Sequence, residues 1–241
     1  MVELIFKIYA YVFARPFFIN LNKFLYHISL RGLGVLNYKG DYLIGENSWL
    51  KNHLEYKERP VVLDMGANVG SYSKRVLEIN QEATILAFEP HPATFKELIS
   101  NITSEKFQAF NVGVGDAEGF FNLYDYDSND GSQHASLYQD VITDLHRGVT
   151  VSHSVEVITL DTFLAEKNID QIDLLKIDTE GNEYKVLQGV RALLHSNKVK
   201  AIHFEFNGMN IVSKSTFKDF WDLIPQYNLY RILPGGWAFG Y

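Results

Sequence analysis

The sequence predicts an α/β protein with a doubly wound, mainly parallel β-sheet and a helical N-terminal extension. From residue 60 onward, short apolar runs typical of buried strands alternate with segments of helical periodicity. A turn containing Gly66 and Gly70 follows the first of these strands. The 241 residues, 46% of them hydrophobic, are sufficient for one large domain with a substantial extension.

Composition excludes several classes of function. The chain has no cysteine, which excludes a disulfide framework, a thiolate metal site and a cysteine nucleophile. Its net charge of -7 disfavours an extended nucleic-acid surface, which needs clustered lysine and arginine. We therefore expect a small or uncharged substrate, no nucleic acid, no metal and a cytoplasmic location.

Residues 1–56 form a separate compositional region, predicted to be an amphipathic helical extension to a domain over 57–241. Pro16 should divide it into two short helices, because proline cannot continue the helical hydrogen-bond ladder. Basic residues interrupt the apolar pattern too often for a membrane span, and no cleavage site typical of a signal peptide follows. The extension is expected to pack on the domain, to form a homodimer contact, or to lie on a membrane with its basic side toward anionic lipid. The charged residues of 1–36 give a balance of +3 and leave -10 for the rest: Lys7, Arg15, Lys23 and Arg31 against Glu3.

The elements of the domain can be predicted in chain order. Pro60 precedes the first strand, over 61–65, and a helix follows the glycine turn over 71–79. Pro90 ends the second strand, over 84–89, and leads to a helix over 93–102. The later apolar runs predict further strands over 108–114, 120–124 (paired with 108–114), 155–159, 173–177, 201–206 and 229–233. The later helical patterns cover 161–165 (capped by Asp161), 182–194 and 215–224.

The glycine turn between the first strand and helix predicts a ligand site. It lacks the middle glycine of the dinucleotide fingerprint and the Gly-Lys-Ser/Thr of a phosphate loop. Asp64, at the end of the strand, would repel an anion but could pair with a cationic ligand. Glu89 ends the next strand, where it could accept both ribose hydroxyls of a nucleoside. Together they favour S-adenosylmethionine; the alternative is that the glycines serve tight packing and Asp64 caps the helix.

Several motifs resemble one known family. VVLDMGANVGSYS, AFEPHP, NVGVGD, LDTF and LLKIDTEGNEYKVLQG, between about residues 60 and 207, are similar to the run of motifs in the FkbM family of class I methyltransferases. The resemblance implies a Rossmann-like, seven-stranded sheet and S-adenosylmethionine-dependent methylation of hydroxyl groups, frequently on sugars or polyketide-type metabolites. RGLGVLNY, from Arg31, resembles members associated with bacterial surface-glycan assembly.

The resemblance also implies which residues bind the cofactor. The turn and the start of its helix would line the methionine and ribose end, Glu89 would hold the ribose and Asp116 would lie near the adenine. Asp178, after the strand 173–177, is a further cofactor candidate. The residues of the turn and helix are Asp64, Gly66, Asn68, Gly70, Ser71 and Tyr72.

Transfer of a methyl group to an alcohol requires alignment of the nucleophile and removal of its proton. Alternation places Lys176 and Asp178 on one face of their strand, with Glu180 at the rim. Lys176 either forms a structural ion pair with a carboxylate or belongs to the substrate site. On the strand 201–206, Glu205 is the candidate nearest the ligand end, and His203, deeper, is more typical of a core histidine.

The polar stretch 125–154 is predicted to be a substrate loop or lid, because long irregular segments in compact domains commonly bind ligands. A calcium loop beginning at Asp125 is excluded, since Asp130 replaces the required glycine and Ser136 the required glutamate. His134, beside a segment resembling the family's Ser-rich element, could act as a base for a hydroxyl or could be a solvated loop residue.

These observations predict an S-adenosylmethionine-dependent O-methyltransferase acting on a sugar hydroxyl. Glu205, His134, Glu180 or Lys176 would supply proton transfer or orientation. The alternatives are N-methylation of an amino sugar or peptide, and a non-catalytic scaffold that docks on a membrane or partner. The C-terminal segment NLYRILPGGWAFGY predicts one strand, a turn and only the beginning of the strand that would close the sheet, as in a truncated chain.

Overall fold

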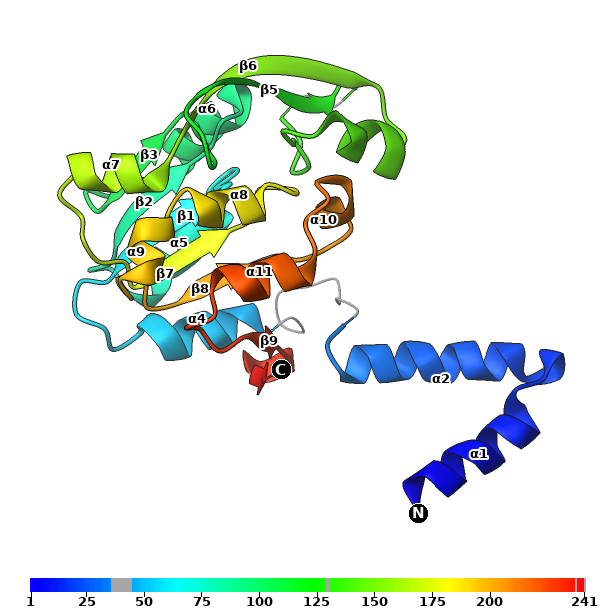
Figure 1. The fold of residues 1–241 in the computed structure, drawn as a ribbon. Coiled ribbons are helices and arrows are strands. Elements are labelled where there is room, and N and C mark those ends of the chain that lie inside the picture. Colours follow the sequence, from blue (N-terminus) through cyan, green and yellow to red (C-terminus); the bar gives the residue numbers. More distant parts are fainter. Residues whose placement is uncertain (36–44, 129–130, 237, 241) are drawn as a thin grey trace. The chain divides into compact units, whose positions relative to one another are not determined.

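The computed structural model describes residues 1–35, 45–128, 131–236 and 238–240, which form two compact units (Figure 1). The larger unit, His53–Asn228, contains the α/β sheet. The smaller unit combines Met1–Asn52 with Leu229–Tyr241. The division of the chain into an extension over 1–56 and a domain over 57–241 stays a prediction.

The central sheet of the larger unit has five parallel strands in the order β3-β2-β1-β7-β8. Strands β2 and β3 are added in turn on one side of β1, and β7 and β8 are then added on its other side. The direction therefore reverses between β1 and β7, which is where open α/β sheets bind ligands. This confirms the predicted α/β fold with a mainly parallel sheet. The five strands are Val61–Met65 (β1), Thr84–Phe88 (β2), Phe107–Phe110 (β3), Leu174–Ile177 (β7) and Ile202–Phe204 (β8).

Helices cover the two faces of this sheet. The strand register places Phe88, Phe110 and Phe204 on one face, because partners in neighbouring parallel strands point to the same side. Phe163 of α7 makes edge contacts with the first two rings, and Phe220 of α11 stacks on the third. These aromatic pairs fix α7 and α11 on one face. The helices of this unit that begin after β1 are Ser71–Ile79 (α5), Pro92–Asn101 (α6), the π-helix Val141–Leu145 (η2), Leu160–Glu166 (α7), Glu183–Gln188 (α8), Arg191–His195 (α9), Met209–Val212 (α10) and Phe217–Leu223 (α11).

A second, three-stranded sheet has the order β4-β6-β5. Its strands are Gly113–Val114 (β4), Gly119–Tyr126 (β5) and Thr150–Ile158 (β6). The predicted strand over 108–114 is wrong as a single element, because Asn111 donates to the carbonyls of Glu89 and Pro90 and the chain leaves the central sheet there. The predicted partner of 120–124 is also wrong: β5 pairs with β6, which begins five residues earlier than expected.

The predicted helix over 182–194 is broken into α8 and α9. Asp161 explains part of the difference: its carboxylate accepts from the backbone amides of Ala192 and Leu193 at 2.9 and 3.4 Å. It therefore caps α9, and the expectation that it caps its own helix is wrong, since Thr159 occupies the N-cap of α7. The short helix α10 was not predicted from the sequence.

In the smaller unit, Pro16 begins a short 3₁₀ turn that separates two helices, as predicted. The strands β9 and β10 pair antiparallel with each other in a two-stranded sheet. Seven strands in one sheet are therefore not found among the described residues. Arg231 of β9 donates to the carbonyl of Gly34, which ties this hairpin to the N-terminal segment. The elements are Val2–Phe13 (α1), Pro16–Phe18 (η1), Ile19–Gly32 (α2), Glu46–Leu54 (α4, continuing into the larger unit), Tyr230–Ile232 (β9), Pro234–Gly236 (η3) and Ala238–Gly240 (β10).

Three sequence features fall partly outside the described residues. Only residues 31–35 of RGLGVLNY are described. Residues 129–130 of the predicted substrate loop and residues 237 and 241 of the C-terminal segment NLYRILPGGWAFGY are not described. Within the described ranges, none of the helices has the length and apolar character needed to cross a membrane.

Candidate functional site

The turn after β1 adopts a conformation that demands glycine. Gly66 has a φ of +72°, and a Cβ there would lie 1.8 Å from the carbonyl oxygen of Asp178. Gly70 has a φ of +89° and faces the side chains of Leu98 and Ile102, which a Cβ would approach to 2.8 Å. Both glycines therefore allow close packing in a left-handed conformation. Asn68, between them, is also left-handed.

The backbone amides of this turn are all engaged within the protein. Those of Gly66 and residue 67 donate to the carbonyl of Phe88, and that of Asn68 donates to the carboxylate of Glu89. The amide of residue 69 donates to the Asn68 side chain, and that of Gly70 to the carbonyl of residue 67. A phosphate cradle needs backbone amides free to face the anion. The turn itself therefore does not supply a phosphate site, in agreement with the sequence argument.

Glu89 is held rigidly beside this turn. It is 6% exposed, and its two carboxylate oxygens accept from the amides of Asn68 (2.9 Å) and His91 (2.8 Å). Burial raises its pKa to about 7, against the opposing effect of these two hydrogen bonds. Each carboxylate oxygen can accept a second hydrogen bond, so Glu89 keeps the capacity to bind a pair of hydroxyl groups.

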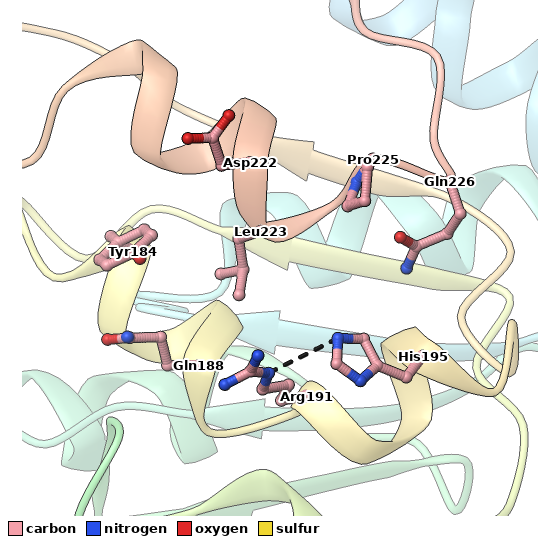
Figure 2. A pocket seen from close by; sticks show the side chains of 8 residues that line it. All are labelled: Tyr184, Gln188, Arg191, His195, Asp222, Leu223, Pro225 and Gln226. Atoms are coloured by element: carbon pink, nitrogen blue, oxygen red, sulfur yellow. Dashed lines mark hydrogen bonds between the residues drawn. The ribbon is translucent and has the colours of Figure 1, made fainter.

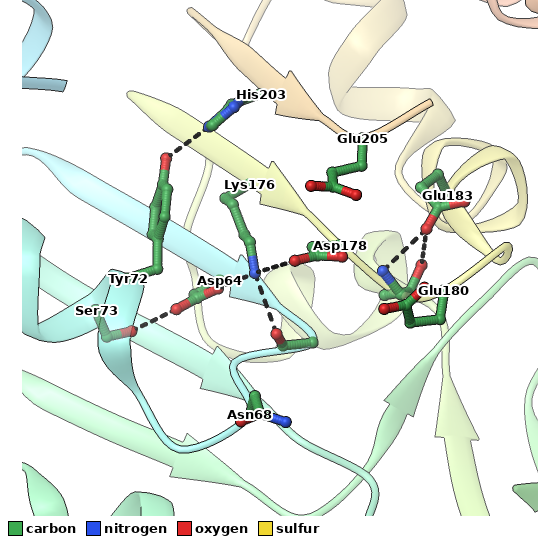
Figure 3. Close-up of polar contacts among 12 residues, drawn as sticks. Asp64, Asn68, Tyr72, Ser73, Lys176, Asp178, Glu180, Glu183, His203 and Glu205 are labelled. Atoms are coloured by element: carbon green, nitrogen blue, oxygen red, sulfur yellow. Dashed lines mark hydrogen bonds and ion pairs between the residues drawn. The ribbon is translucent and has the colours of Figure 1, made fainter. Parts of the chain in front are cut away.

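Three polar side chains form a row across the centre of the sheet. Asp64 of β1 is the register partner of Lys176 of β7, which is in turn the partner of His203 of β8. This face is opposite to the phenylalanine face described above. Tyr72 of α5 contacts the row, and the hydroxyl of Ser73 donates to Asp64 at 2.7 Å (Figure 3).

Lys176 is the centre of this row. Its ammonium lies 3.2 Å from Asp64 Oδ1 and 3.6 Å from Asp178 Oδ2, and it donates to the carbonyl of Gly66 at 3.1 Å (Figure 3). Asp64 has no exposed surface and Lys176 is 8% exposed. The cation that pairs with Asp64 in this structure is therefore Lys176, which agrees with the structural interpretation of the lysine. A contact between Asp64 and a ligand stays a prediction.

Tyr72 and His203 are joined by a hydrogen bond of 3.1 Å between the hydroxyl and Nδ1. Burial, reinforced by the charge of Lys176, lowers the pKa of His203 to about 4. His203 is therefore neutral at physiological pH, and this half-buried residue of the edge strand β8 is hydrogen-bonded to Tyr72. The Tyr72 hydroxyl is directed to His203.

Three acidic side chains gather where β7 and β8 end: Asp178, Glu180 and Glu205 (Figure 3). Burial and the neighbouring carboxylates raise the pKa of Glu180 to about 8. The pKa of Glu205 is also raised, first by partial desolvation of its carboxylate and then by Asp178, although Asn207 donates to it at 3.0 Å. Glu180 therefore holds a proton near neutral pH, which suits a group that takes part in proton transfer.

His134 reaches this acidic group from the polar loop. Its Nδ1 lies 3.1 Å from Glu180 Oε1, and about half of its side chain is exposed. The other carboxylate oxygen of Glu180 is buried without a hydrogen-bond partner in the described part of the chain. An exposed imidazole oriented by a carboxylate is the arrangement used by general bases.

Several residues that support this pair were not predicted from the sequence. Ser136 donates to the backbone carbonyl of Glu180 at 2.7 Å, and the ring of His146 packs edge-on against His134. Buried Glu183 accepts from the amides of Thr179 and Gly181 and fixes the turn in which Glu180 has a φ of +51°.

Two predicted cofactor residues lie apart from these contacts. Ser71 is exposed at the start of α5, and Asp116 is exposed after β4. The structure thus brings the sequence-predicted residues together in two groups. One is the glycine turn with Glu89, and the other is the acidic side chains at the ends of β7 and β8 with His134. The ion pairs of Lys176 with Asp64 and Asp178 connect the two groups.

The loop that carries His134 is anchored by Asp125. This fully buried carboxylate accepts from the amides of Tyr126, Gly131 and Ser132. The predicted loop is shorter than 125–154, because β5 continues to Tyr126 and β6 starts at Thr150. No cluster of three or more histidine, aspartate or glutamate side chains suited to a metal ion occurs in the described ranges.

A pocket of about 250 Å³ lies elsewhere, among α8, α9 and α11 (Figure 2). Its polar side chains include Arg191 and His195, whose Nε and Nε2 atoms are 3.5 Å apart. None of the sequence-predicted site residues lines it. The chemistry described above therefore belongs to the strand ends.

The fold and this site define an α/β protein whose candidate site lies at the carboxyl ends of parallel strands. The family model of the methyltransferase FkbM domain matches residues 64–232 of this chain. The match covers the glycine turn, Glu89 and the acidic side chains Asp178, Glu180 and Glu205. The chain belongs to the FkbM methyltransferase family.

Several proteins named as methyltransferases are similar to this chain in sequence. The chain is 28% identical over 195 residues to the 2-O-methyltransferase NoeI of Sinorhizobium fredii, covering 75% of this chain and 77% of that protein. It is 31% identical over 145 residues to Methyltransferase 1 of Beauveria bassiana, covering 54% and 57%. The hexuronic acid methyltransferase AglP of Haloferax volcanii is 26% identical over 156 residues, covering 64% and 60%. The chain thus spans less than two thirds of the last two relatives.

Proposed function

We propose that this methyltransferase uses S-adenosylmethionine to methylate a hydroxyl group of a sugar. The observation that carries the proposal is the contact of 3.1 Å between His134 and Glu180, which places an exposed imidazole at the ligand end of the sheet. An alcohol is a poor nucleophile until its proton is removed, so a base in this place favours a hydroxyl acceptor.

The residues of the glycine turn fit the proposed cofactor. Glu89 would accept the two ribose hydroxyls, because each of its oxygens has one acceptor position left after binding Asn68 and His91. The engaged amides of the turn argue against a phosphate-bearing cofactor. Asp64 and Asp178 both face Lys176, so these three groups together carry one net negative charge, which favours a cationic over an anionic ligand. When bound, S-adenosylmethionine would supply a methyl carbon activated by its positive sulfur.

His134 would remove the proton of the acceptor hydroxyl. When Glu180 is ionised it accepts from Nδ1–H of His134, which leaves Nε2 unprotonated and able to take a proton. When Glu180 is protonated it donates to Nδ1, and Nε2 then carries the hydrogen. Because the pKa of Glu180 is raised to about 8, turnover should increase as the pH rises toward that value. Glu180 is a positioning residue in this scheme, and the exposed Glu205 lies beside it to orient the acceptor.

The sugar acceptor is proposed from the relatives' functions. NoeI is a 2-O-methyltransferase, and AglP methylates a hexuronic acid according to its name. The polar composition of the rim supports the same class, because a sugar presents several hydroxyl groups that carboxylates can bind.

The test combines cofactor binding with turnover. Calorimetry should show that the full chain binds S-adenosylmethionine, and mass spectrometry should detect a product heavier by one methylene from a panel of sugars and glycans. His134→Asn should lower kcat by ~10²–10⁴-fold with cofactor affinity unchanged. His195→Asn, which changes an exposed histidine of α9, is the matched control and should leave kcat unchanged. Glu180→Gln should abolish the rise of activity toward pH 8.

The outcomes separate the alternatives. Turnover of amino sugars or peptides but not alcohols, with little effect of His134→Asn, would assign N-methylation, since a neutral amine needs no base. Cofactor binding without turnover on the whole panel would favour a non-catalytic scaffold. Failure to bind S-adenosylmethionine would refute the proposed function.

A further inference from the structure

The N-terminal helices form a hairpin with defined internal contacts. The side chain of Asn22 in α2 accepts from the Tyr9 hydroxyl at 2.7 Å and donates to the carbonyl of Phe13 at 2.9 Å. The ring of Phe13 stacks on Tyr9 and makes an edge contact with Phe18 in the connecting turn. The two helices are therefore joined at their shared end by polar and aromatic contacts.

Neither helix of this hairpin buries a residue. In α2, Leu21, Phe24, Leu25 and Ile28 follow the i, i+3, i+4, i+7 spacing of one face, and each is at least 40% exposed. An amphipathic helix with an uncovered apolar face is incomplete in water, because apolar surface gains about 25 cal/mol per Å² when it is buried.

The helix α1 is apolar around most of its circumference. Leu4, Ile8 and Tyr11 lie on one side, Ile5 and Phe6 lie on others, and all five are more than half exposed. Its charged residues are confined to one stripe, Glu3 and Lys7 at i, i+4, with their charged groups 3.9 Å apart. A second protein copy would cover one face of such a helix. A lipid interface can surround everything except the charged stripe.

The charge of the hairpin identifies the surface that it fits. Residues 1–35 carry four basic side chains and one acidic, a balance of +3, and the whole chain carries -7, so the remainder carries -10. Two such hairpins would repel one another. An anionic surface would attract the hairpin and repel the rest of the chain, which makes attachment specific to this segment.

We propose that the hairpin of α1 and α2 docks on an anionic lipid bilayer and lies in its interface. Helices of 12 and 14 residues are about 18 and 21 Å long, shorter than the ~30 Å hydrocarbon core, so they lie along the surface. The basic side chains of α2, spaced four residues apart, face the lipid headgroups: Lys23, His27 and Arg31. The apolar face of α2 described above, which includes Phe24, enters the boundary between headgroups and acyl chains.

The test is cosedimentation of the full chain with vesicles. Vesicles of phosphatidylcholine with one third phosphatidylglycerol should bind the protein, and vesicles of phosphatidylcholine alone should bind at least ten-fold less. Lys23→Glu should weaken binding by ~5–30-fold, because each basic charge near an anionic surface contributes about five-fold. Phe24→Asp should weaken it by more than ~10-fold through loss of apolar burial. Raised salt should release the wild-type protein.

Matched controls come from the larger unit. Tyr56→Asp changes an aromatic residue that is 89% exposed, and Lys96→Glu changes an exposed lysine of α6; both should bind vesicles as the wild type does. Equal binding to both vesicle types would overturn the proposal, as would equal effects of Lys23→Glu and Lys96→Glu. Absence of vesicle binding together with a dimer in sedimentation velocity that Phe24→Asp dissociates would overturn it in favour of self-association.

Discussion

Replacement of Lys176 by methionine should destabilise the larger unit strongly. Asp64 has no exposed surface, and its Oδ1 is 3.2 Å from the ammonium that would be lost. Two unit charges at this distance attract by ~5 kcal/mol at an effective dielectric constant of about 20. Removal of one partner of a buried pair costs ~3–5 kcal/mol. Because Ser73 still donates to Asp64, we expect Lys176→Met to lose ~3 kcal/mol of unfolding free energy.

The matched double variant isolates the ion pair. Asp64→Asn removes the charge but keeps an oxygen that can accept from Ser73. Urea unfolding followed by far-ultraviolet circular dichroism should show that Lys176→Met with Asp64→Asn costs at least ~1.5 kcal/mol less than the sum of the single changes. Additive single effects would refute the ion-pair argument. A loss below ~0.5 kcal/mol in Lys176→Met, with loss of turnover, would instead place the lysine in the substrate site.

Three further predictions follow from the site. Glu180→Gln should be increasingly stable relative to the wild type from pH 4.5 to 8, by up to ~1.4 kcal/mol per pH unit in denaturant titrations, because only the unfolded state ionises Glu180 in that window; a constant difference would contradict the raised pKa. Gly66→Ala should cost more than ~1 kcal/mol and lower the melting temperature, since its Cβ would clash with Asp178; an unchanged melting temperature would contradict this. Glu89→Gln should weaken S-adenosylmethionine binding ~10–100-fold in calorimetry, whereas Glu166→Gln, at an exposed position of α7, serves as the control. Equal affinities would argue against ribose binding.

The strands and helices around the glycine turn could be predicted almost to the residue. The turn lies between a short buried strand bounded by Pro60 and a helix of regular periodicity, and both signals are local. The break at Asn111 could not be predicted, because it depends on carbonyls of Glu89 and Pro90 about twenty residues away. For the same reason the role of Asp161 as the cap of α9 was not visible in its own helix.

Some neighbours within the candidate site could be predicted from the sequence, but most of the contacts could not. Alternation along the strand placed Lys176 and Asp178 on one face, and their charged groups lie 3.6 Å apart. The partner of Lys176 was open, since only the parallel register of β1 and β7 sets Asp64 opposite the lysine. His134 precedes Glu180 by 46 residues, and its approach depends on the path of the loop that carries it. The sequence of this loop has no periodic pattern from which the path could be predicted.

All backbone amides of the glycine turn donate hydrogen bonds within the protein, and this has a consequence for ligand recognition. Its five amides are satisfied by the fold alone, so the turn keeps its shape whether or not a ligand is present. A preorganised wall adds little ordering entropy to the cost of association. Under the proposed function, discrimination between nucleosides would rest on the side-chain carboxylate of Glu89 at the edge of the turn. Exchange of Glu89 would then be a more direct route to altered ligand preference than redesign of the loop.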